Sequence, residues 1–106
     1  MTFDIKLKVG FFKTQPYYLA IRPGQIIMTP QEDQEDGSLV IEDKELQSVS
    51  ITRRKLHSME LEIVSHSITL IGSFASQTDM EEAAKNLARE FKHKFIFGSE
   101  SFEHDR

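Results

Sequence analysis

The sequence contains no cysteine among its 106 residues. This absence excludes disulfide scaffolds, thiolate nucleophiles and thiolate metal sites. No apolar stretch approaches the length that a membrane-spanning helix needs. Positive charge is also scarce, since 13 lysine and arginine residues stand against 17 aspartate and glutamate residues, which gives a net charge of −4. Nucleic-acid binding in general needs a basic surface, so we expect no nucleic-acid partner.

The length and the hydrophobic fraction of 39% are typical of one globular domain with one core. The first residues, Met1 to Lys6, lack the apolar stretch of a signal peptide. We therefore expect a cytoplasmic protein in which residues 1–98 form a single domain. Residues 99–106 are polar and are expected to form a flexible tail.

Up to Phe74 the apolar residues recur at every second position, which is typical of β-strands with one buried face. Turn residues interrupt this alternation, among them Pro23-Gly24, a pair that favours a type II turn. A change of phase between Leu46 and Val49 is consistent with a β-bulge. The pattern predicts seven strands, near residues 5–11, 17–21, 26–29, 39–41, 46–51, 59–63 and 68–74.

The apolar period then changes once, to that of an amphipathic helix over roughly residues 78–95. A capping box is expected at its start, formed by Thr78 with Glu81 or by Asp79 with Glu82. One apolar stripe follows the helix and is expected to bury against the strands. The stripe consists of Met80, Ala83, Ala84, Leu87, Ala88 and Phe91.

A series of antiparallel strands followed by one amphipathic helix resembles the pleckstrin-homology-like (PH-like) superfold. The resemblance extends from about Phe3 to Phe95 and is carried by the strand succession, the hairpin over residues 17–29 and the helix over residues 79–89. It implies a mainly β fold, a partly open barrel of about seven antiparallel strands with a C-terminal helix that plugs one end. The absence of tryptophan favours a divergent or bacterial member, and for bacterial members the resemblance implies homo-oligomers.

Basic residues in the turns are the candidate ligand-binding positions, because lysine and arginine contact phosphate oxygens. The resemblance implies that the first and third interstrand loops are neighbours at the mouth of the barrel. The third loop here, residues 31–38, carries four carboxylates that would repel a phosphorylated head group. Phosphoinositide binding is therefore a disfavoured alternative, and solvated loop charges are the simpler interpretation. The candidates are Lys13, Arg22, Arg53, Arg54 and Lys55.

No other motif predicts chemistry. The acidic run that begins at Glu32 lacks the first aspartate and the closing glutamate of a calcium loop. The four histidines are scattered, and the neighbours Ser65 and His66 would point to opposite faces of a strand. We therefore expect no catalytic residue, no metal site, no cofactor and no enzyme activity.

The interpretation that remains is a non-enzymatic domain that acts through protein–protein contacts, either self-association or the docking of a peptide. A partly open barrel leaves a sheet edge, and such an edge can accept an added strand. The alternative is a binding module for an anionic lipid or a phosphorylated ligand.

Overall fold

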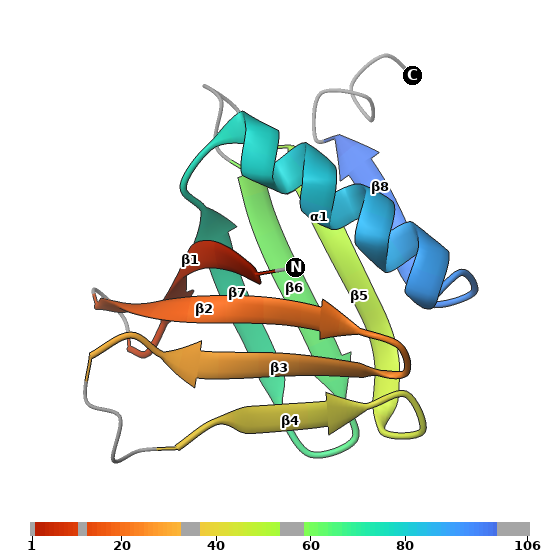
Figure 1. The fold of residues 1–106 in the computed structure, drawn as a ribbon, viewed down its shortest axis with the longest axis horizontal. Helices are drawn as coiled ribbons and strands as arrows, with labels where there is room; N and C mark the ends of the chain where they lie inside the picture. The colour runs from red at the N-terminus through yellow and green to blue at the C-terminus, as the bar shows by residue number, and fades with distance from the viewer. Residues whose placement is uncertain (1, 11–12, 33–36, 54–58, 100–106) are drawn as a thin grey trace.

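Eight strands and one helix form the described part of the chain, which comprises residues 2–10, 13–32, 37–53 and 59–99 of a computed structural model (Figure 1). The elements are β1 (Thr2–Lys8), β2 (Thr14–Arg22), β3 (Gln25–Pro30), β4 (Leu39–Glu42), β5 (Leu46–Arg53), β6 (Met59–Ser65), β7 (Thr69–Phe74), α1 (Gln77–Glu90) and β8 (Phe95–Ser99). All strands belong to one sheet with the order β4-β3-β2-β1-β7-β6-β5-β8. Neighbouring strands are antiparallel except β5 and β8, which are parallel.

The sheet bends into two layers whose strands cross at a steep angle (Figure 1). β1 joins the layers, because it pairs with β2 along its whole length and with β7 only from Ile5 to Leu7. The barrel stays open, since β4 and β8 are the two edges of the sheet. α1 covers one end and contacts β1, β2, β7 and β8. The expected fold class, a partly open barrel capped by a C-terminal helix, is confirmed.

The hydrophobic core fills the space between the two layers and the helix. Burial alternates strictly along β1, where Phe3, Ile5 and Leu7 are buried and their neighbours are exposed. This alternation confirms the predicted period of two. Burying a side chain of this size stabilises the fold by about 1.5–3 kcal/mol. The buried apolar residues are Phe3, Ile5, Leu7, Tyr17, Leu19, Ile21, Ile26, Met28, Ile41, Leu46, Val49, Ile51, Leu61, Ile63, Leu70, Phe74, Met80, Ala83, Leu87 and Phe91.

The turn between β2 and β3 and the bulge in β5 are as predicted. Gly24 has a φ of 75°, the left-handed value that the second central position of a type II turn requires. The pairing of β5 with β6 shifts between Leu46 and Ser48, which confirms the bulge. Gly72 permits a close approach of β7 to β1, because a β-carbon there would lie 2.9 Å from the carbonyl oxygen of Lys6.

The helix begins earlier than the predicted capping box would place it. Its N-cap is Ser76, whose Oγ accepts a hydrogen bond from the Asp79 N–H at 3.1 Å. Ser76 has an extended backbone, with φ −148° and ψ 160°, as N-cap residues do. The prediction of Thr78 or Asp79 as the cap is therefore wrong, because the first helical residue is Gln77.

The helix also ends earlier than predicted, at Glu90, and an eighth strand follows it. The predicted count of seven strands and the predicted helical end near residue 95 are therefore wrong. Phe91 and Phe95 are separated by the spacing of one helical turn, and both pack against the core. The helical spacing of apolar residues therefore continues past the end of α1, which is why the sequence predicts a longer helix. The N–H groups of Lys94 and Phe95 both donate to the carbonyl of Phe91 and close this turn. β8 reaches Ser99, one residue beyond the predicted domain boundary.

The buried side of α1 differs from the predicted stripe on one flank. Met80, Ala83 and Leu87 are buried as expected, but Ala88 is exposed and Asn86 is buried. The Nδ2 of Asn86 donates to the carbonyl of Glu82 at 2.8 Å, and its Oδ1 accepts a hydrogen bond from Arg89. A polar residue could take a buried position because both ends of its amide are satisfied within the helix.

Candidate functional site

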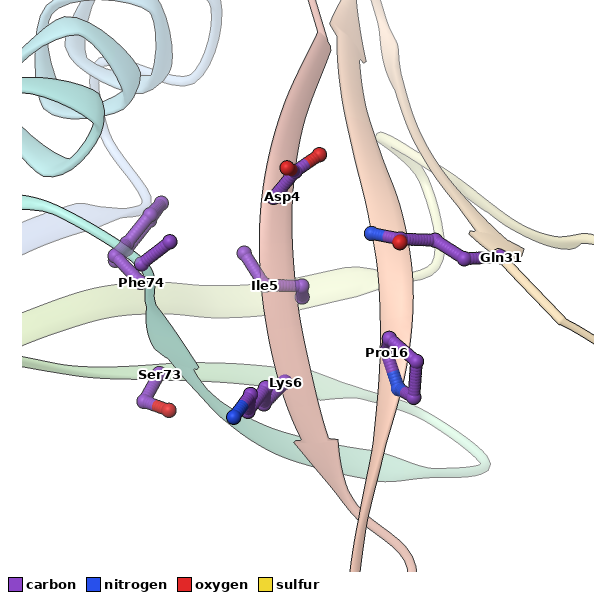
Figure 2. A pocket seen from close by; sticks show the side chains of 8 residues that line it. Asp4, Ile5, Lys6, Pro16, Gln31, Ser73 and Phe74 are labelled. Atoms are coloured by element: carbon purple, nitrogen blue, oxygen red, sulfur yellow. The ribbon is translucent and has the colours of Figure 1, made fainter.

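A cavity of about 460 Å³ lies where β1, β2 and β7 meet beside the end of β3 (Figure 2). Gln31 covers one side of it and is fixed to β2, since its N–H donates to the carbonyl of Pro16 and its Nε2 donates to the carbonyl of Tyr17. Lys6 pairs with Pro16 on one side and with Ser73 on the other, so it lies at the centre of this surface. The lining residues are Asp4, Ile5, Lys6, Pro16, Gln31, Ser73, Phe74 and Ala75.

The charges of this cavity do not favour either catalysis or phosphate binding. Asp4 and Lys6 are two positions apart on β1 and therefore share one face of the sheet, with a spacing of roughly 7 Å between their Cα atoms. The carboxylate offsets the ammonium group at this distance and weakens the attraction for an anion. The lining contains no histidine and no second carboxylate that could complete an acid–base pair.

A second hollow, a groove of about 300 Å³, lies between β4 and the turn that joins β6 to β7. We call it the β4 groove. The turn fixes Ile68 at its rim, because the Ile68 N–H donates to Ser65 Oγ at 3.2 Å and the Ile68 carbonyl accepts from the Ser65 N–H at 2.9 Å. Its walls are mainly aliphatic. The lining residues are Leu39, Val40, Ile41, Glu45, Ser65, Ser67, Ile68 and Leu70.

The two edge strands expose both backbone groups and large apolar side chains. The N–H of Asp43 donates to the carbonyl of Gly24 at 2.8 Å, and antiparallel ladders alternate, so the N–H groups of Val40 and Glu42 point away from β3. The Glu42 N–H donates to Glu45 Oε1 at 3.2 Å and its carbonyl accepts from the Glu45 N–H at 2.8 Å, which leaves Val40 as the position of β4 that can pair with another chain. Val40 is 47% exposed. Within the described ranges β4 has a neighbouring strand only on the β3 side. Such an edge can form hydrogen bonds with another chain.

β8 has the same character at the other edge of the sheet. The N–H of Val49 donates to the carbonyl of Lys94 at 2.9 Å. In a parallel ladder this bond directs the N–H and C=O groups of Phe95 and Phe97 away from β5. The Phe95 N–H donates to the carbonyl of Phe91, so Phe97 is the position of β8 whose N–H can pair with another chain. Ile96 and Phe97 are 59% and 49% exposed. Both edges thus combine outward backbone groups with exposed apolar side chains.

The structure separates two of the predicted basic positions, Lys13 and Arg22. Lys13 precedes β2 and Arg22 ends it, so nine steps along an extended chain separate them by roughly 30 Å. Arg53 ends β5, where it pairs with Ser99 of β8. Arg54 and Lys55 lie outside the described residues. Anion binding at any of these positions stays a prediction.

Histidines and carboxylates form no candidate metal centre in the part of the chain that the structure describes. His66 and His93 are exposed and lie in different turns, and the Nδ1 of His66 is 3.3 Å from the Nε2 of Gln47. His57, His104 and most of the acidic loop, residues 33–36, lie outside the described residues.

The apolar edge residues were not predicted as a surface from the sequence. One signal was present, because Leu39, Val40 and Ile41 are consecutive apolar residues and cannot all face the core from one strand. The run from Phe95 to Phe97 carried the same signal, which the assumed helix obscured.

Comparisons with known proteins show the fold alone. No family model matches this chain, and no curated protein matches it. Among solved structures, a chain of the "Structure of the Spt16D Pob3N heterodimer" is similar to it with a TM-score of 0.67 and 15% sequence identity. The likeness covers 93% of this chain and 53% of that chain, so this chain spans about half the length of the one it matches. No helix among the described residues is long and apolar enough to cross a membrane.

Proposed function

We propose that this chain is a non-enzymatic protein-interaction domain that binds an extended segment of another chain along β4. The observation that carries the proposal is the β4 groove beside an open strand edge. The N–H and C=O groups of Val40 would supply hydrogen bonds to the added strand. Leu39 and Ile68 would supply an apolar pocket for its alternate side chains.

The solved structure that resembles this chain supports the proposal only in general terms. That structure is a heterodimer, which is an assembly of two proteins. The sequence identity of 15% is too low to transfer a partner or a binding surface. The choice of β4 therefore rests on this chain's own geometry.

A displayed library of random peptides tests the proposal without a known partner. Peptides selected on the wild-type chain should lose affinity about tenfold or more for Val40→Pro, because proline removes an outward N–H and an added strand loses about one to two hydrogen bonds. Val40→Thr is the matched control, since it keeps both the N–H and the β-branched shape. Selected peptides that bind Val40→Pro and wild type equally would place the docking surface elsewhere.

A further inference from the structure

We infer that the segment which β4 accepts is strand β8 of a second copy of this chain, paired antiparallel to β4. This inference rests on the proposed function, because it names the partner of the same strand edge. It joins the two open edges of the sheet in a head-to-tail contact. Three independent features of the described residues favour this occupant.

The first feature is the match of backbone groups. Val40 directs its N–H and C=O groups outward from β4, and Phe97 does so from β8. An antiparallel register that sets Val40 opposite Phe97 of the second copy lets these two residues exchange a pair of hydrogen bonds. The same register sets Glu42 opposite Phe95, whose N–H groups already donate within their own copy, to Glu45 Oε1 and to the carbonyl of Phe91.

The second feature is the match of side chains in that register. Residues opposite each other in an antiparallel pair project to the same face. Phe97 of the second copy would then pack against the exposed Val40, while Ile96 would lie on the other face, beside Ile41. That face of β4 contains the β4 groove, whose walls include Ile68. The exposed Val40 and Phe97 would thus cover each other, and the exposed Ile96 would be covered by the groove wall.

The third feature is charge. The end of β4 carries Glu42 and Glu45, both exposed, and the approach to β8 carries Lys92 and His93, also exposed. The antiparallel register brings the end of β4 beside the start of β8, so the carboxylates of one copy lie near the basic residues of the next. Pairing β8 with β8 would instead bring the Arg53 end of each copy beside the Lys92 end of the other, which repels.

A contact between two different edges has a consequence that a two-fold contact lacks. A dimer formed in this way still presents an open β8 on one copy and an open β4 on the other, so further copies can add. The predicted assembly therefore grows beyond a dimer with concentration, either to a closed ring or to an open chain.

Complementation between two blocked variants tests the inference. Val40→Pro blocks β4, and Phe97→Pro blocks β8, each at an N–H that points away from the sheet. In sedimentation velocity at low salt, the wild type should exceed the mass of a dimer as concentration rises. Each variant alone should be monomeric, and an equimolar mixture should form a dimer of one copy of each and nothing larger.

Other outcomes overturn the inference. They are a wild type that stays monomeric at every concentration, a blocked variant that dimerises alone, and a mixture that stays monomeric. Val40→Lys with Ile96→Lys provides a second pair of variants, and circular dichroism identifies any variant that fails to fold. A monomeric wild type whose selected peptides still depend on Val40 would overturn this inference and leave the proposed function standing. Peptides that ignore Val40→Pro would overturn the proposed function itself.

Discussion

Lys94 Nζ donates a hydrogen bond to the Oδ1 of Asp43 at 3.1 Å, although the two residues are 51 positions apart in the chain. The same ammonium group also donates to the backbone carbonyl of Asp43. The contact ties the turn between β4 and β5 to the turn that precedes β8. It therefore fixes the end of one edge strand relative to the start of the other.

Removing this contact should lower stability modestly. Lys94→Met is expected to reduce the free energy of unfolding by about 1 kcal/mol, because the pair is partly exposed but one bond goes to a backbone carbonyl. Lys85→Met is the control, since the Lys85 ammonium lies 4.0 Å from Glu82 on the exposed side of α1. Urea unfolding followed by circular dichroism measures both. Equal losses for the two variants would contradict the role assigned to Lys94.

The close approach of β7 to β1 predicts a large penalty at one glycine. Gly72→Ala should lower the free energy of unfolding by about 1–3 kcal/mol, since the new β-carbon would meet a backbone oxygen that cannot move aside easily. Gly98→Ala should change it little, because no atom lies within 4 Å of the added carbon. Thermal unfolding of both variants at the same low protein concentration makes the comparison. A Gly72→Ala protein as stable as Gly98→Ala would show that the two strands can separate without cost.

The position of the helix cap is testable by two substitutions of similar size. Ser76→Ala should lower the free energy of unfolding by about 1 kcal/mol, because the Asp79 N–H loses its acceptor at the helix start. Thr78→Ala should lower the free energy of unfolding by no more than a few tenths of that amount, since Thr78 is exposed and already within the helix. Chemical denaturation of the two variants decides between Ser76 and the cap expected from the sequence. A larger loss for Thr78→Ala would restore the original expectation.

Charge reversal tests the proposed contact between copies. Lys92→Glu and Glu45→Lys should each weaken self-association, because each places like charges at the end of the strand pair. The double variant should recover much of the wild-type association, since it restores opposite charges between copies. Sedimentation velocity at low salt gives the masses, and added salt should weaken the wild-type assembly. Single variants that assemble as the wild type does would exclude the charge argument.

The strand pattern could be predicted because each of the first seven strands has one buried face. In β1 and β6 alternation is nearly complete, and the period of two identifies them directly. β8 could not be found in this way. Its apolar run begins at Phe95, which continues the spacing of the helical stripe through Phe91, and only the parallel pairing with β5 makes it a strand.

The functional surface was harder to predict than the fold. Whether the backbone groups of Val40 and Phe97 are paired depends on which strands are edges, and that follows from the order of all eight strands. The basic residues stood out because charge is visible in a sequence. Their separation along β2, from Lys13 to Arg22, became apparent only in the folded chain.

Amide exchange in β4 tests the central proposal most directly. With a selected peptide bound, the N–H of Val40 should exchange at least about tenfold more slowly, because it points away from β3 and would donate to the added strand. The Glu42 N–H already donates to Glu45 Oε1 and the Asp43 N–H to the Gly24 carbonyl, so both should change much less. Residue-resolved exchange measured by NMR gives all three rates. Unchanged exchange at Val40 under saturating peptide would contradict strand addition at β4.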